Sequence, residues 1–286
     1  MIITEKKRPI AVHPLVESNF GLDGGAMFGI VPKPLWTRST PADENNRIDL
    51  ACRCLLVQYE DKNILVDVGI GSRWSDKEKS IYKIHNQDRG LLNALAQHNL
   101  KAGDIDEVVL THLHFDHAGG LCFEDEGRLK PTFPEATHWL QKRNWDWAHG
   151  PTARDAGSYR IDDFSFFEKE GAPPLNLVDG PTELFPGFEV FPQFGHTPGM
   201  QICKISTDGD TYFYLADLIP TSAHLRDPYI MSYDLHPLTT LREKRDILHE
   251  AMKVDGILIF EHDPKTPMGR VEKDAKGRIK LIPTVG

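Results

Sequence analysis

The sequence predicts an α/β fold in which strands and helices pack in layers. Strand-like runs and helical patterns follow one another in the order strands, helix, strands, helix, strand, which is typical of a layered sandwich. The length of 286 residues, with 40% hydrophobic and 26% charged residues, suits one packed core. No internal repeat, low-complexity tract or linker divides the chain. We therefore expect a single domain over residues 1–286.

The first half of the chain contains a predicted hairpin, a helix and a short strand. Residues Cys52–Tyr59 and Ile64–Asp67 are apolar runs separated by a polar turn, the pattern of two paired strands. Apolar residues recur at helical spacing over Gly90–Leu100, with Asp88 as the expected cap. Glu107–Leu110 is expected to form a short buried strand, and a histidine-rich motif begins where it ends.

The second half begins with the aromatic stretch Trp139–Phe167, which has no clean period and is expected to form a helix and an irregular excursion. A helix is expected to open at a capping box made by Thr240 and Glu243 and to end near Lys253. Four further strands are expected between turn-forming residues, at Phe188–Phe191, Gln201–Ser206, Tyr212–Ala216 and Ile257–Phe260.

An apolar segment near the N-terminus, Gly24–Pro32, holds large side chains between glycines and prolines. This make-up fits a mobile flap beside a binding site, and it fits equally a strand hairpin packed into the core. On the first interpretation, the stretches Met27–Trp36 and Trp145–Phe167 line a substrate entrance. On the second, Phe28 and Trp145 are core residues.

The net charge of −9 disfavours nucleic acid as a partner, because binding phosphates requires a basic surface. No segment approaches the roughly 20 apolar residues of a membrane-spanning helix, and none has the make-up of a signal peptide. We expect a cytoplasmic protein that acts on a small molecule, with or without assembly into a homodimer.

The four cysteines, Cys52, Cys54, Cys122 and Cys203, are too few and too scattered for a disulfide scaffold. Free cysteine is among the most buried residue types. They are expected to be small packing residues.

The chemistry-bearing motif is Thr111-His112-Leu113-His114-Phe115-Asp116-His117. In an extended stretch His112 and His114 point the same way, and a turn at Asp116 and His117 presents a second pair beside them. Such side chains are seldom buried without partners or metal. Imidazole and carboxylate ligands favour Zn²⁺, with Fe, Mn and Co as alternatives, and the lack of thiolates argues against a structural zinc knot.

The segment Thr111–Gly120, THLHFDHAGG, resembles the signature of the metallo-β-lactamase superfamily. The other elements of that pattern follow in order, and together they span residues from about 50 to 265: Asp67-Val68-Gly69, Gly195-His196-Thr197-Pro198-Gly199, Tyr214-Leu215-Ala216-Asp217 and Phe260-Glu261-His262. The resemblance implies an αββα sandwich of two mixed sheets flanked by helices.

The resemblance also implies a ligand set for two Zn²⁺ ions per chain. One ion would be held by His112, His114 and His196, the other by Asp116, His117 and His262, with Asp217 as the bridge. Asp67 would orient a ligand without necessarily touching metal. The remaining histidines are expected to be surface or packing residues, among them His85, His98, His138, His149, His224, His236 and His249.

The resemblance implies hydrolysis by a hydroxide that bridges the two metals. Asp116 would be the catalytic residue that moves the proton. No G-x-S-x-G elbow offers a serine nucleophile. A metal-binding sensor without turnover is the non-enzymatic alternative, and the complete ligand set counts against it.

Several branches of the superfamily fit less well. Flavodiiron proteins have Glu where this chain has His114, and a ribonuclease of the RNase Z kind needs a basic surface. A glyoxalase II-like thioesterase stays open as an alternative, although the short segment after His262 leaves no room for that family's helical domain. The remaining branch contains lactonases, including acyl-homoserine lactonases, and ester or organophosphate hydrolases.

Two positions depart from the lactonase pattern. Pro220 stands where those enzymes usually have a tyrosine three residues after the bridging Asp, and Met200 replaces a second histidine. Pro220 offers no donor for a carbonyl oxygen, and Met200 is expected to make the pocket wall more apolar. Activated apolar esters or lactones are the expected substrates, with Tyr233 or Tyr159 as a replacement hydroxyl.

Overall fold

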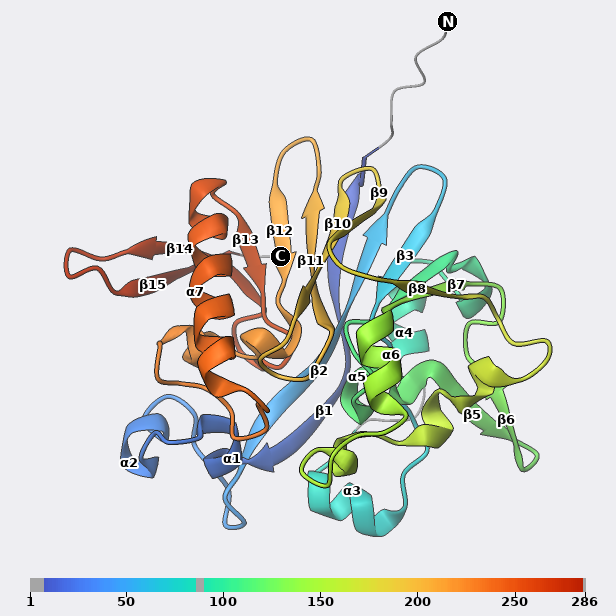
Figure 1. Ribbon diagram of the computed structural model, residues 1–286, viewed down its shortest axis with the longest axis horizontal. Helices are drawn as coiled ribbons and strands as arrows, with labels where there is room; N and C mark the ends of the chain where they lie inside the picture. The colour runs from blue at the N-terminus through green and yellow to red at the C-terminus, as the bar shows by residue number, and fades with distance from the viewer. Residues whose placement is uncertain (1–7, 86–89, 285–286) are drawn as a thin grey trace, which may run out of the picture.

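The computed structural model describes residues 8–85 and 90–284, which form two large sheets and the helices around them (Figure 1). In spatial order, the six-stranded sheet consists of β1 (Ala11–Asp23), β2 (Arg47–Gln58), β3 (Asn63–Val66), β4 (Glu107–Val109), β7 (Thr137–Gln141) and β8 (Leu175–Val178). The seven-stranded sheet consists of β15 (Ile279–Pro283), β14 (Met268–Lys273), β13 (Ile257–Ile259), β12 (Thr211–Tyr214), β11 (Met200–Ser206), β10 (Phe188–Gln193) and β9 (Thr182–Phe185). A separate hairpin pairs β5 (Cys122–Asp125) with β6 (Arg128–Pro131).

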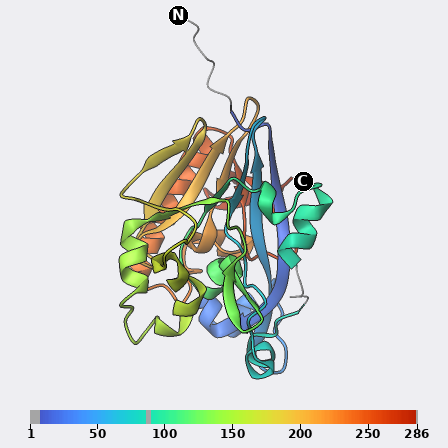
Figure 2. The same cartoon turned by 90° about the vertical axis from the view of Figure 1, so that its right-hand side faces the viewer.

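Both large sheets are mixed, because β3 and β4 run parallel in one and β12 and β13 run parallel in the other, beside antiparallel neighbours. Helix α4 (Gly90–Gln97) lies outside the first sheet and α7 (Pro237–Lys253) outside the second (Figure 2). The predicted αββα sandwich is confirmed.

The shorter helices are α1 (Gly24–Phe28), α2 (Lys33–Trp36), α3 (Asp76–Tyr82), α5 (Phe115–Ala118) and α6 (Lys142–Ala148). The 3₁₀ turns are η1 (Ala102–Asp104), η2 (Gly119–Leu121), η3 (Ala156–Ser158), η4 (Ile161–Asp163), η5 (Ser165–Glu168), η6 (Ala216–Leu218) and η7 (Ser222–Leu225).

The pleat of β2 explains how one strand serves two hydrophobic layers. Leu55 and Val57 pack into the core between the sheets, while Cys54 and Leu56 pack into the core under α4. Successive side chains of a strand point to opposite faces, so a strand that is apolar on both faces lies in the middle of the sandwich. The predicted hairpin is confirmed, since Leu55 pairs with Val66 in antiparallel register.

The sequence did not predict β1, which pairs with β2 along its whole length. Helix α4 is confirmed, although it ends at Gln97, and its expected cap Asp88 lies outside the described residues. The excursion after Trp139 is confirmed as α6 followed by three 3₁₀ turns. All four cysteines are buried and free, as predicted.

The predicted start of α7 is wrong. The helix begins at Pro237, three residues before Thr240, because proline is favoured in the first turn of a helix. Glu243 makes no capping box. Its carboxylate instead accepts hydrogen bonds from the backbone N–H groups of Phe194 and Gly195, so α7 anchors the loop that carries His196.

The segment that contains Gly24–Pro32 is neither a flap nor a hairpin. It forms α1 and α2, in which Met27, Phe28 and Trp36 are at most 1% exposed. Phe28 stacks on Trp36 with 5.1 Å between ring centroids. The core interpretation is therefore correct for packing and wrong for secondary structure.

No helix among the described residues is long and apolar enough to cross a bilayer.

Candidate metal centre

The seven predicted ligand residues come together at one edge of the sandwich, where strands of both sheets end. His112, His114, Asp116 and His117 follow β4, and the last three open or belong to α5. The other three follow strands of the second sheet: His196 lies in the β10–β11 loop, Asp217 in the turn after β12, and His262 after β13. All seven are buried.

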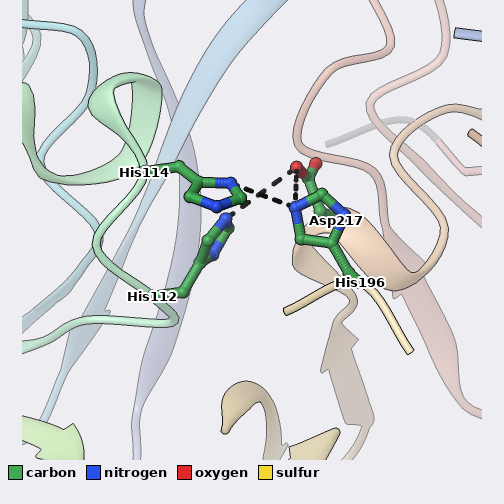
Figure 3. Close-up of side chains that lie close together, drawn as sticks. All are labelled: His112, His114, His196 and Asp217. Carbon is green, nitrogen blue, oxygen red and sulfur yellow. Dashed lines mark hydrogen bonds and ion pairs between the residues drawn. The ribbon is translucent and has the colours of Figure 1, made fainter. Parts of the chain in front are cut away.

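The first set consists of His112, His114, His196 and Asp217, which offer ligand atoms that all lie within 4.8 Å of one another. Figure 3 shows the rings of His112 and His114 facing His196 and Asp217. The Nε2 atom of His196 lies 3.1 Å from Nδ1 of His114 and 3.0 Å from Oδ2 of Asp217. Four donor atoms thus converge on one point.

The second set consists of Asp116, His117 and His262, which meet the same distance limit. Asp217 reaches this set too. Its Oδ1 lies 3.1 Å from Nε2 of His262, and its Oδ2 lies 3.7 Å from Nε2 of His117. One carboxylate therefore stands between both groups of nitrogens.

Four of the histidines have the ring nitrogen that faces away from the centre fixed by a hydrogen bond. Nδ1 of His112 lies 3.0 Å from the Thr111 hydroxyl, and Nδ1 of His262 lies 2.8 Å from the carbonyl of Ala51. Such contacts set the tautomer and orientation of a metal-binding imidazole. For His196 and His117 the partner is a carboxylate.

Two of these carboxylates had been given no role from the sequence. Oδ1 of Asp234 lies 2.8 Å from Nδ1 of His196, and Oε1 of Glu261 lies 3.0 Å from Nδ1 of His117. Glu261 adjoins a motif residue, which is a signal that could have singled it out. Asp234 stands 38 residues after its partner, and no local pattern marks it.

Asp67 also contacts His117, with 3.1 Å between Oδ2 and Nδ1. Its backbone has φ of 56°, an uncommon value for an aspartate, and its carboxylate accepts hydrogen bonds from the backbone and hydroxyl of Thr111. The following loop lies against Gly119 and Gly120, where a Cβ atom would stand 2.3 and 2.1 Å from carbonyl oxygens. Only glycine permits this approach.

Burial lowers the pKa of His112 and of His114 well below the ordinary value, so both rings are neutral and have a lone pair for a metal. Burial acts in the same direction on His196 and His262, but nearby carboxylates outweigh it. Asp217 contributes most, and the pKa values rise to about 10 and about 9. Burial raises the pKa of Glu261 to about 7. The carboxylates around His196 and His262 thus favour a positive charge at the centre.

The chemistry of the donors fits metal ions. Among the described residues, the buried Nε2 atoms of His112 and His117 have no hydrogen-bond partner, and the nearest carboxylate oxygens lie 3.7–3.9 Å away. A buried polar atom without a partner is destabilising by about 1–3 kcal/mol, so two such atoms in one cluster require an explanation. Coordination of metal would satisfy both.

A cavity of about 270 Å³ opens onto the centre. Its lining includes Asp116 and Asp217 of the candidate metal centre and an apolar and aromatic wall. That wall consists of Leu22, Met27, Tyr82, Phe115, Met231 and Tyr233.

The expected pocket residues have mixed outcomes. Met27 lines the cavity, but Phe28 does not and is fully buried. Trp145 packs against the core under α4, away from the cavity lining. Met200 is also fully buried, in the core between the sheets, so its expected role in the pocket wall is wrong. Pro220 is buried, and its carbonyl accepts a hydrogen bond from the backbone N–H of His262.

Comparison with known proteins identifies the family. Residues 47–262 match the profile of the Metallo-beta-lactamase superfamily. The chain belongs to this superfamily. The superfamily assignment covers every predicted ligand residue, from the β4 motif to His262.

Individual relatives agree with the assignment. The chain is 24% identical to an N-acyl homoserine lactonase of Bacillus cereus over 239 residues, which is 78% of this chain and 86% of the lactonase. A probable metal-dependent hydrolase from Staphylococcus aureus has a similar structure, with a TM-score of 0.83, 30% identity and coverage of 98% and 99% of the two chains. A dizinc quorum-quenching lactonase shares the fold with a TM-score of 0.77, 22% identity and 98% coverage of each chain. This superfamily member is a metal-dependent hydrolase.

Proposed function

We propose that the centre holds two Zn²⁺ ions and that the protein hydrolyses an ester or lactone bond. The observation that carries the proposal is the position of Asp217, whose two oxygens lie within 3.9 Å of imidazole nitrogens of both ligand sets. Imidazole and carboxylate donors suit zinc, and they also accept Fe, Mn or Co. When bound, a metal pair polarises the substrate carbonyl and lowers the pKa of water toward neutrality.

Asp116 is the proposed catalytic residue. Its carboxylate lies 3.7 Å from Nε2 of His117 and 3.6 Å from Nε2 of His262, and it lines the cavity. From this place it accepts the proton of the attacking water and delivers it to the oxygen that leaves. A carboxylate that both touches the centre and faces the substrate is suited to this transfer.

Tyr233 is the proposed hydrogen-bond donor to the carbonyl oxygen. It would replace the tyrosine that lactonases usually have at the position of Pro220. Tyr159 is unsuited, because its hydroxyl is 2.7 Å from the hydroxyl of Thr197 and is thus occupied. Tyr233 lines the cavity, and no hydrogen bond of its hydroxyl is found among the described residues. Its phenol keeps its proton at neutral pH, because burial raises its pKa well above the usual value.

The proposed substrates are activated esters or lactones with an apolar body, acyl-homoserine lactones and organophosphates among the candidates. The apolar wall supports this class, and so does the lactonase among the sequence relatives. A lactone is a cyclic ester, so the same attack on a carbonyl carbon serves both. A cavity of about 270 Å³ limits the enclosed part of the substrate to a small group.

The test combines metal analysis with activity. Purified protein should contain two zinc ions per chain, and a panel of an aryl ester, an acyl-homoserine lactone, a thioester and a phosphotriester should reveal ester or lactone turnover. Tyr233→Phe should reduce kcat about 100-fold, whereas Tyr159→Phe should leave kcat nearly unchanged. Full activity in metal-free protein, or turnover of the thioester alone, would contradict the proposal.

A further inference from the structure

The wall of the cavity contains one strong cation. Among the residues that line it, Arg154 is the only lysine or arginine. It lies between α6 and the turn η3, in the excursion that follows β7. The side chain is exposed to solvent, so it stands at the mouth of the cavity.

The guanidinium of Arg154 is held on one side only. Its Nη2 donates a hydrogen bond to the carbonyl of Ser232, and the backbone N–H of Ser232 in turn donates to the carbonyl of Ala26 at 2.7 Å. These two hydrogen bonds link the Arg154 loop to the Ser232 loop and the Ser232 loop to α1, and the first of them orients the guanidinium. A guanidinium has five N–H donors, so most of its donors stay uncommitted.

No carboxylate among the described residues forms an ion pair with Arg154. The neighbouring carboxylate of Asp155 accepts hydrogen bonds from the Trp147 indole and the Thr152 hydroxyl. The two carboxylates that line the cavity, Asp116 and Asp217, lie among the ligand nitrogens. Arg154 therefore has no ion-pair partner among the described residues, and apolar and aromatic side chains make up much of the wall beside it.

We propose that Arg154 binds a carboxylate of the substrate, so that the preferred substrate is an ester or lactone with a second, anionic group away from the bond that is cut. The proposal rests on the proposed function and narrows its substrate class. A planar guanidinium with adjacent free N–H groups matches a carboxylate in geometry as well as charge. The protein carries a net charge of −9, which repels an anionic substrate. A local cation is therefore needed to bind such a substrate at the mouth of the cavity.

The test uses two esters that differ in one charge, 4-carboxyphenyl acetate and its methyl ester. The metal-loaded wild-type protein should have a lower KM for the carboxylate. Arg154→Met should raise that KM about 10-fold, the loss expected for one charge-assisted contact open to solvent, and should leave the KM of the methyl ester and both kcat values nearly unchanged. Added salt should weaken the preference of the wild-type protein.

Arg242→Met is the matched control, since Arg242 is also exposed and donates one hydrogen bond, to Thr239, on α7 outside the cavity. It should change neither KM. If Arg154→Met raised the KM of the charged and the neutral ester equally, Arg154 would only hold the Ser232 loop in place. That result would overturn the proposal. An unchanged preference would overturn it as well.

A binding measurement keeps this test separate from the proposed function. If the protein turned over neither ester, calorimetry would compare 4-acetamidobenzoate with its methyl ester on metal-loaded protein. Tighter binding of the carboxylate that is lost in Arg154→Met supports the anion site even then. Equal binding of the two compounds refutes it.

Discussion

Asp234 offers a sharp test of whether the two ligand sets bind separate ions. Its carboxylate lies 2.8 Å from Nδ1 of His196, and the two side chains are 1% and 2% exposed. Asp217 and Asp234 together raise the pKa of His196 to about 10 against the effect of burial. Asp234→Ala removes the contact that orients this ring, and loss of such a contact weakens metal binding by about 10- to 100-fold, or about 1.4–2.7 kcal/mol.

The loss should be confined to one ion. His196 belongs to the first set, whereas Asp116, His117 and His262 have their own partners. A titration with a chromophoric zinc chelator should release one ion from Asp234→Ala at about 10- to 100-fold lower chelator activity than from wild type. The second ion should leave at the concentration that wild type requires.

Asp163→Asn is the matched control, because Asp163 is also a buried carboxylate and forms an ion pair with Arg73 that is remote from the ligand sets. This variant should be less stable but should retain both ions. Simultaneous release of both ions from Asp234→Ala, or release at the wild-type concentration, would refute the reasoning.

Three further predictions concern the centre, the core and pH. Asp217→Ala should lose more than one ion and most activity, since its oxygens reach both sets, whereas His98→Ala should lose neither by elemental analysis. Phe28→Ala should lower the free energy of unfolding by about 3–5 kcal/mol in urea titrations, because its ring is fully buried; an intact stability with raised KM would contradict this. Burial lowers the pKa of Lys244 to about 8, below that of the unfolded chain, so the unfolded state binds more protons between pH 8 and about 10.5. The free energy of unfolding should therefore gain up to about 3 kcal/mol from this residue across that window, and the gain should be absent in Lys244→Met.

The sequence predicted the cluster of candidate ligands because most of its signal is local. His112, His114, Asp116 and His117 stand within six residues, and a motif that dense requires no knowledge of the fold. His196 and His262 were found through the family pattern. The structure adds the reason that all of them meet, which is that each follows a strand ending at the same edge of the sandwich.

Interactions between distant segments could not be predicted in this way. The T-x-x-E pattern at Thr240 was misleading, since the same Glu243 carboxylate serves the loop before His196. Asp234 has the same character, because only the folded chain brings it to His196. Such partners carry no signature in a single sequence, because nothing in the residues next to Asp234 distinguishes it from an aspartate on the surface.

Most of the pocket wall and the predicted metal ligands come from different parts of the fold, and this separates specificity from chemistry. The predicted ligands follow strands of the two sheets. Apart from Phe115 of α5, the wall residues come from the end of β1, from α1 and α3, from the excursion after α6 and from the loop around Ser232. Two hydrogen bonds at the backbone of Ser232 link three of these segments: the Arg154 guanidinium donates to its carbonyl, and its N–H donates to the carbonyl of Ala26 in α1. Replacing a wall residue such as Met231 should therefore change which substrate fits and leave the predicted ligands unchanged, because Met231 lines the cavity and is not among them. A fold built in this way keeps one hydrolytic centre and adapts its substrate through the loops above it.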